Sequence, residues 1–153
     1  MSKIIGVVPA AILGDQTKSN MNDYYKMGNN YAKRVLEAGC VPIGMVPVDY
    51  WLTEEALDLC DGFIVQGGDE FYAYHFQVIH HAITHGKKYL GICLGEQLIY
   101  VYLELKRRVE ERGYEGDLIK GICDYIEEQG PTFSVQEKVE GHRSGAMPRG
   151  QED

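Results

Sequence analysis

The chain has 153 residues, of which 44% are hydrophobic and 25% charged, and its 15 basic and 23 acidic side chains give a net charge of −8. This length fits one domain. No apolar run reaches the roughly 20 residues of a membrane span, and none has the form of a signal peptide. We therefore expect a cytoplasmic protein without a membrane partner. The acidic balance and the lack of a basic segment argue against nucleic acid as a partner, and the four cysteines lie too far apart for a CxxC pair.

Apolar runs and helical repeats alternate over the first part of the chain. Residues 3–9 form an Ile- and Val-rich run followed by a polar stretch over 14–20, which predicts a buried strand and a loop. Over residues 23–35 the apolar side chains recur at spacings of three and four, which predicts an amphipathic helix that Gly39 would end. A second apolar run over 41–47 predicts another strand.

The same order continues through the middle of the chain. The patterns predict a helix over 53–59, a strand over 62–66, a helix over 71–85, a strand over 88–92 and a further helix that Gly113 ends. Because short apolar strands alternate with helices, the sequence predicts an α/β fold with a mostly parallel central sheet covered on both faces.

The pattern weakens after residue 113. The spacing of Leu118, Ile122 and Ile126 predicts one more helix, and residues 132–135 are compatible with a strand. Residues 141–153 are polar and glycine-rich, so we expect a single domain over 1–140 and a flexible tail over 141–153.

One short segment has a chemically specific pattern: Gly91-Ile92-Cys93-Leu94-Gly95 joins a predicted strand to a predicted helix. Glycines two residues before and after a cysteine are typical of a nucleophile elbow, a turn too tight for side chains at the flanking positions. The elbow would hold the Cys93 thiol at the carboxyl edge of the sheet, where a helix N-terminus favours a thiolate and the N–H of Leu94 faces a developing oxyanion. The alternative is a buried cysteine between two packing glycines.

The segment over 89–97 resembles the nucleophile motif of the class I glutamine amidotransferase superfamily. Three further stretches, residues 3–9, 31–47 and 60–69, are similar in the same order to its peptidase-type γ-glutamyl-γ-aminobutyrate hydrolase branch. The resemblance covers about the first 100 residues. It implies a flavodoxin-like three-layer sandwich that acts on glutamine or another small γ-glutamyl compound without a cofactor.

The resemblance implies roles only at matching positions. Cys93 would be the nucleophile that forms a γ-glutamyl thioester, the backbone N–H groups of Gly68 and Leu94 would form the oxyanion hole, and Gly67 and Gln97 would help to hold the substrate. Glycines at 67 and 68 would let the backbone approach a carbonyl oxygen closely, although a simple strand-to-helix turn would also explain them.

The superfamily's base and its orienting carboxylate come from a late His-x-Glu pair that has no counterpart here, so we expect a C-terminally shortened domain. Only His142 follows Cys93, and it is a candidate base although a histidine in a polar tail is usually solvated. Positioned acid–base catalysis contributes about 10²–10⁴-fold, so turnover by this chain alone is expected to be inefficient. Glu96, where relatives mostly have a neutral or imidazole side chain, either faces solvent or weakens the nucleophile by its charge.

Other candidate sites have simpler interpretations. His81 and His85 have the i, i+4 spacing of a metal-binding pair, but no third ligand is evident and we predict no metal site. Cys40, Cys60 and Cys123 lie in apolar or helical contexts and are interpreted as small buried hydrophobic residues.

Three functions remain open. The first is cysteine-dependent hydrolysis of a γ-glutamyl amide, which the elbow and the glycine turn favour. The second is a catalytically incomplete binding or assembly module, as a homo-oligomer or with a complementing subunit, which the missing His/Glu pair favours. The third, ranked last, is a thiol sensor in which Cys93 is oxidised.

Overall fold

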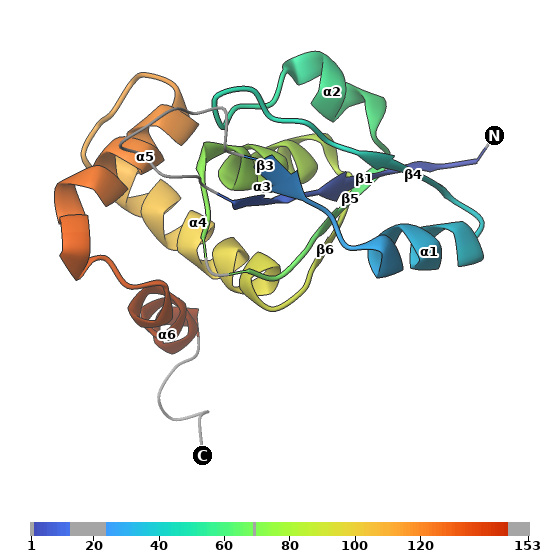
Figure 1. Ribbon diagram of the computed structural model, residues 1–153. Helices are drawn as coiled ribbons and strands as arrows, with labels where there is room; N and C mark the ends of the chain where they lie inside the picture. The colour runs from blue at the N-terminus through green and yellow to red at the C-terminus, as the bar shows by residue number, and fades with distance from the viewer. Residues whose placement is uncertain (1, 13–23, 69, 147–153) are drawn as a thin grey trace. The chain divides into compact units, whose positions relative to one another are not determined.

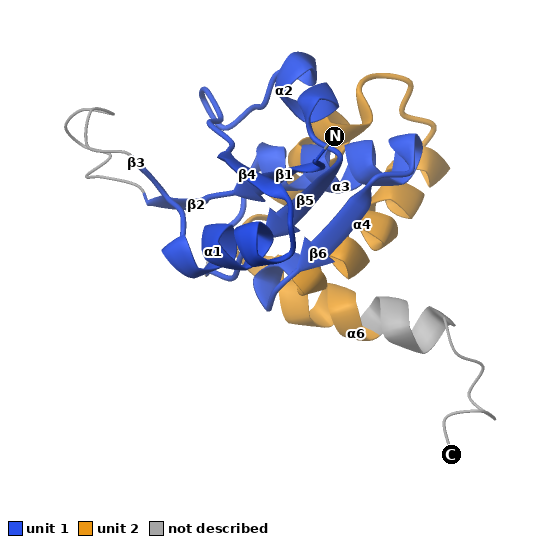
Figure 2. Ribbon diagram, turned by 90° about the vertical axis from the view of Figure 1, so that its right-hand side faces the viewer, with its two compact units in different colours: residues 1–95 blue, residues 96–153 orange. Residues whose placement is uncertain are grey.

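The computed structural model describes residues 2–12, 24–68 and 70–146, with side chains described as far as residue 140 (Figure 1). The chain divides into two compact units, residues 1–95 and residues 96–153 (Figure 2). The loop expected over 14–20 and the last part of the expected tail, residues 147–153, lie outside the described residues.

The first unit is built on a four-stranded parallel sheet with the strand order β4-β1-β5-β6. Its strands are β1 (Ile4–Val8), β4 (Val41–Gly44), β5 (Gly62–Val65) and β6 (Lys88–Gly91). The chain leaves β1 toward one edge of the sheet, to β4, and leaves β5 toward the other edge, to β6. The strand order therefore reverses between β1 and β5, and in open α/β sheets such a reversal opens a crevice at the carboxyl ends of the strands.

Three helices accompany this sheet: α1 (Asn29–Glu37), α2 (Glu54–Leu59) and α3 (Ala73–His85). The helices α1 and α3 lie on opposite faces of the sheet (Figure 2). On the α3 face, Tyr74, Val78 and Ala82 pack in one buried cluster with Phe63 and Val65 of β5. This mostly parallel sheet flanked by helices confirms the predicted α/β, flavodoxin-like fold.

The helix predicted over 23–35 is wrong in its first part. Tyr24–Lys26 forms β3, which pairs antiparallel with β2 (Ala10–Ile12), and α1 begins only at Asn29. Tyr25 packs edge-on against Tyr74 with ring centroids 6.1 Å apart, whereas its neighbour Tyr24 is exposed. The side chains therefore alternate as in a strand, because pairing with β2 outweighs the helical spacing of the sequence.

The second unit is helical. It contains α4 (Leu94–Glu111), whose first two residues belong to the first unit, α5 (Leu118–Gln129), the short 3-10 helix η2 (Gly130–Thr132) and α6 (Val135–Ala146). Asp117 caps α5 by accepting a hydrogen bond from the N–H of Lys120 at 3.0 Å. The strand expected over 132–135 is wrong, since η2 ends and α6 begins there, and α6 continues into the expected tail as far as residue 146.

Paired charges stabilise the second unit. The guanidinium groups of Arg107 and Arg108 donate to the same oxygen of Glu104, at 2.8 and 2.9 Å. Burial acts to raise the pKa of Glu104, but the two donated hydrogen bonds outweigh burial and the pKa is lowered.

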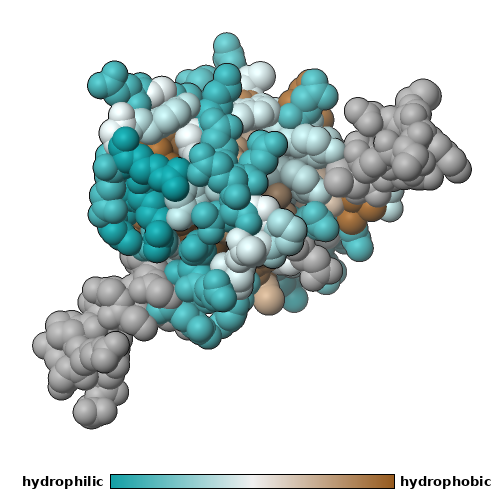
Figure 3. Space-filling model, turned by 90° about the vertical axis from the view of Figure 1, so that its left-hand side faces the viewer, coloured by the Kyte–Doolittle hydropathy of each residue, from teal (hydrophilic) through white to brown (hydrophobic). Residues whose placement is uncertain are grey.

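Hydrophilic side chains dominate the face shown in Figure 3. Among the described residues, no helix combines the length and the apolar character that crossing a membrane requires.

Candidate functional site

The carboxyl ends of β5 and β6 bring the predicted elbow and the predicted glycine turn together. The two strands pair in register as far as Val65 opposite Gly91, so the residues that follow leave the sheet side by side. A Cβ atom placed on Gly67 would stand 3.2 Å from the Cβ atom of Cys93. Two segments identified separately in the sequence therefore meet at one edge of the sheet.

The backbone at Cys93 has the strain that an elbow imposes. Its φ is +58°, a left-handed conformation that residues other than glycine rarely adopt. The N–H of Ile92 donates to the carbonyl of Val65 at 2.9 Å, and the N–H of Gly95 donates to the carbonyl of Ile92 at 3.1 Å. A Cβ atom at Gly95 would clash with the carbonyl oxygen of Val65, so glycine is required at this position, as the elbow interpretation predicts.

The Cys93 side chain is exposed, which excludes the alternative of a buried packing cysteine. Leu94 is the first residue of α4, so its N–H has no carbonyl partner within the helix. The hydroxyl of Tyr89 on β6 donates to the carbonyl of Gly95 at 2.6 Å, and because burial raises the pKa of Tyr89 the phenol stays protonated. The turn is thus fixed from both β5 and β6.

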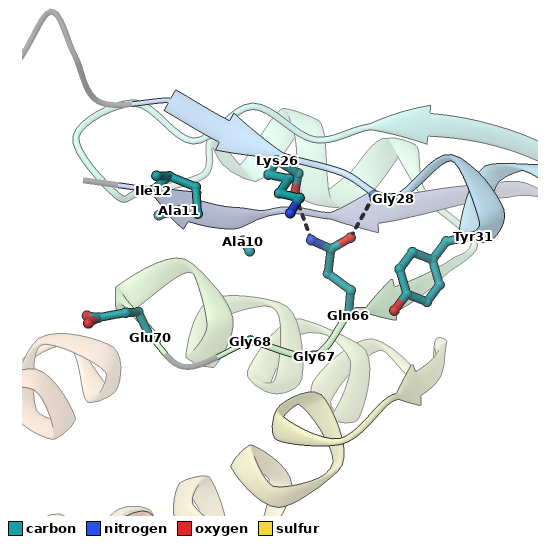
Figure 4. A pocket seen from close by; sticks show the side chains of 10 residues that line it. All are labelled: Ala10, Ala11, Ile12, Lys26, Gly28, Tyr31, Gln66, Gly67, Gly68 and Glu70. Atoms are coloured by element: carbon teal, nitrogen blue, oxygen red, sulfur yellow. Dashed lines mark hydrogen bonds between the residues drawn. The ribbon is translucent and has the colours of Figure 1, made fainter. Parts of the chain in front are cut away.

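A pocket of about 390 Å³ lies beside this turn (Figure 4). Its lining comes from the segment that follows β1, from β3 and the start of α1, and from the segment that follows β5. The lining residues are Ala10, Ala11, Ile12, Lys26, Gly28, Tyr31, Gln66, Gly67, Gly68 and Glu70. The pocket therefore lies at the reversal of strand order, and its volume is in the range of small-molecule sites.

Gln66 joins two walls of this pocket. Its side chain is 8% exposed, and it donates to the carbonyl of Lys26 at 2.7 Å while it accepts from the N–H of Gly28 at 3.0 Å (Figure 4). The hydroxyl of Tyr74 similarly fixes the segment after β1, since it donates to the carbonyl of Pro9 at 2.6 Å. Gln66 was not predicted as a site residue, although a polar side chain directly after a buried strand at a carboxyl edge is a recognisable signal.

The family described as "Glutamine amidotransferase class-I" matches residues 20–153 of the chain. The chain belongs to this family. The resemblance found over residues 89–97 is therefore confirmed at the level of the superfamily, and the exposed cysteine on its elbow agrees with the cysteine-dependent chemistry that the family suggests. Among curated proteins, none matches the chain.

Three other residues predicted for the site, Glu96, Gln97 and His142, belong to the second unit. Gln97 and Glu96 lie in the first turns of α4, where both side chains are half-buried. The backbone of His142 is part of α6, and its side chain lies outside the described part.

The side chains described up to residue 140 include no histidine placed to serve Cys93 as a base. His75 is buried, its Nδ1 accepts from the N–H of Tyr72 at 2.9 Å, and burial lowers its pKa to about 4. His80, His81 and His85 lie toward the C-terminal end of α3, just before β6 begins, and therefore near the amino edge of the sheet. None of these four histidines is therefore a candidate base for Cys93.

Proposed function

We propose that this class I amidotransferase hydrolyses γ-glutamyl amides through Cys93 and belongs to the γ-glutamyl-γ-aminobutyrate hydrolase branch. The observation that supports the proposal is an exposed cysteine on a strained elbow, next to Gly67 and to a pocket at the carboxyl edge that Gly67 lines. A cysteine needs this exposure and this position at a helix N-terminus to act as a nucleophile.

The proposed reaction has two steps. The sulfur of Cys93 attacks the γ-carbonyl carbon, the carbonyl oxygen takes up negative charge opposite the N–H groups of Leu94 and Gly68, and the carbon–nitrogen bond breaks as the amine leaves with a proton. Water then adds to the γ-glutamyl thioester, releasing glutamate and restoring the thiol. Glycine at 67 supports this assignment, because a side chain there would meet Cys93.

The charged residues of the pocket fit the amino-acid end of a γ-glutamyl group. Lys26 supplies a cation and Glu70 an anion to the lining, which complement the α-carboxylate and the α-ammonium of the substrate. The carboxylate of Glu70 also accepts a hydrogen bond from the hydroxyl of Tyr72 at 3.1 Å. Glutamine and small γ-glutamyl amides are therefore the proposed substrate class.

Amine release from a panel of γ-glutamyl amides tests the proposal. We expect release by the wild type and none by Cys93→Ser. Lys26→Ala and Glu70→Ala should raise KM by about tenfold with little change in kcat, because each removes one charge-assisted contact. Lys33→Ala, an exposed change on α1 outside the pocket lining, is the matched control and should leave KM unchanged. Release that persists in Cys93→Ser would refute the role of the thiol.

The second candidate is a binding or assembly module that keeps the pocket but lacks turnover. The absence of a suitably placed base among the four described histidines favours it. Calorimetric binding of glutamate or glutamine to the wild type, without amine release from any member of the panel, would identify this function instead.

A further inference from the structure

The strongest cluster outside the proposed active site joins α2 to the end of α3. Asp58 near the end of α2 and His81 and His85 on α3 each offer one ligand atom, and these three atoms lie within 4.8 Å of one another. The sequence shows the i, i+4 histidine pair but not the third ligand, since Asp58 comes from a different helix. Asp58 and His85 are exposed, whereas His81 is 2% exposed.

The hydrogen bonds of His85 leave one nitrogen available. Its Nδ1 lies 3.0 Å from the carbonyl oxygen of His81 and 3.0 Å from the hydroxyl oxygen of Thr84. The Thr84 hydroxyl donates its own proton to the carbonyl of His80 at 2.8 Å, so we assign the ring proton of His85 to Nδ1. The lone pair of this neutral imidazole is therefore on Nε2. Metal-ligating histidines are typically oriented by such a bond from their second nitrogen to a backbone carbonyl.

His81 has an unsatisfied buried atom that faces the same place. Its Nε2 has no hydrogen-bond partner among the described residues, although it lies 3.5 Å from Oδ1 of Asp58. Its other ring nitrogen, Nδ1, lies 3.8 Å from a carboxylate oxygen of Glu54. A buried polar atom without a partner normally signals a missing ligand.

We propose that Asp58, His81 and His85 bind a divalent transition-metal ion, with Zn²⁺ as the best match to two imidazoles and one carboxylate. Tetrahedral zinc requires ligand atoms about 3.3 Å apart, close to the present separation of His81 Nε2 and Asp58 Oδ1. The imidazoles of His81 and His85 stack with centroids 3.9 Å apart, so the exposed ring of His85 must tilt to present Nε2. Water would take the fourth position.

The charge and position of the cluster indicate what the ion would do. The ammonium of Lys87 donates to the carbonyls of Leu57 and Asp58, and its positive charge disfavours a bound cation. The two carboxylates of Asp58 and Glu54 leave the cluster with a net charge of one negative unit. The cluster lies where α2 and α3 approach the starts of β5 and β6, at the edge opposite Cys93. The ion would therefore fasten the six-residue helix α2 to α3 rather than take part in catalysis.

Zinc binding to the full chain tests the proposal by calorimetry, with visible absorption of bound Co²⁺ as a second readout. All proteins carry Cys93→Ser, so that the exposed thiol cannot bind the probe. Asp58→Asn and His85→Ala change exposed residues and should not impair folding. His80→Ala, on the same helix but outside the cluster, is the matched control.

We expect one Zn²⁺ per chain, at least tenfold weaker binding in Asp58→Asn and His85→Ala, and no change in His80→Ala. Zinc should raise the melting temperature of the parent and of His80→Ala but not of His85→Ala, since the ion binds only the folded state. No saturable zinc binding at micromolar concentration, or equal affinity in all four proteins, would overturn the proposal. Neither result would bear on amine release by the wild-type thiol.

Discussion

At the scale of single residues, the decisive feature is the contrast between Cys93 and the other cysteines. Cys93 is exposed at a helix N-terminus, whereas Cys60 is buried and Cys123 half-buried. Burial raises the pKa of the Cys60 thiol, and it raises the pKa of Cys123 to about 11. Only thiolates react rapidly with alkylating agents, so the raised pKa values and the burial of Cys60 and Cys123 both slow these two thiols, whereas Cys93 is exposed.

Iodoacetamide at neutral pH should therefore modify Cys93 at least tenfold faster than Cys60 or Cys123, as followed by peptide mass spectrometry. The Cys93→Ala protein supplies the control, and its remaining cysteines should react at the slow rates seen in the wild type. Modification of Cys60 or Cys123 as fast as Cys93 would contradict the picture of an exposed nucleophile on an elbow.

A second prediction at this scale concerns the glycine that closes the elbow. Gly95→Ala would drive a Cβ atom into the carbonyl oxygen of Val65, so we expect a loss of about 2–3 kcal/mol in the free energy of unfolding. Gly68→Ala is the matched change, since its Cβ would only touch Ala10 at 3.8 Å and should cost less than about 0.5 kcal/mol. Urea denaturation measures both, and equal losses would show that the close approach at Gly95 is unimportant.

At the scale of elements, the sequence predicts what is locally encoded. The helices α2, α3 and α4 and the strands β5 and β6 follow from apolar spacing, the Thr53 cap and helix-ending glycines. The strand β3 was missed because its partner β2 lies more than ten residues earlier in the chain, and pairing over such a separation leaves no local signal. The helix α6 was missed because its sequence is mostly polar, with Val139 buried within it.

The start of α3 carries a prediction about pH. His75 accepts a hydrogen bond from the N–H of Tyr72 at the first turn, and burial lowers its pKa from 6.5 to about 4. A lowered pKa in the folded state means that the stabilisation is complete above pH 6.5 and is lost as the pH falls toward 4. Over this window the wild type should lose about 3 kcal/mol of unfolding free energy through His75 alone.

His75→Asn keeps an acceptor for Tyr72 but does not titrate in this range. Urea unfolding of both proteins between pH 7 and pH 4 should therefore show the steeper decline in the wild type, with the carboxylate contributions common to both. If the free energy of unfolding fell equally with pH in both proteins, protonation of His75 would not destabilise the folded state, and the prediction would be wrong.

At the scale of the whole molecule, the sequence predicted the turn that exposes Cys93 and the glycine turn beside it, but not the pocket. Cys93 and Gly67 were identifiable because glycine spacing encodes a turn locally, and parallel strands bring two such turns to one edge. The pocket lining combines Gln66 with Lys26 and Tyr31, which come from distant parts of the chain. They meet only once β3 has paired with β2, so no spacing in the sequence relates them. The acid–base group cannot be derived in the same way, because the one described histidine near that edge, His75, is buried and its Nδ1 accepts from the N–H of Tyr72.

Because the side chains described up to residue 140 include no histidine placed as a base for Cys93, we predict rescue from solution. Free imidazole can protonate the leaving amine and activate the water that attacks the thioester, so it should accelerate wild-type hydrolysis of a chromogenic γ-glutamyl anilide by about tenfold or more. Cys93→Ser should show no acceleration beyond the reaction of imidazole with the anilide alone, because the sulfur is still required for attack. A wild-type rate that is high without imidazole, insensitive to its addition and abolished by His142→Ala would instead assign the base to His142.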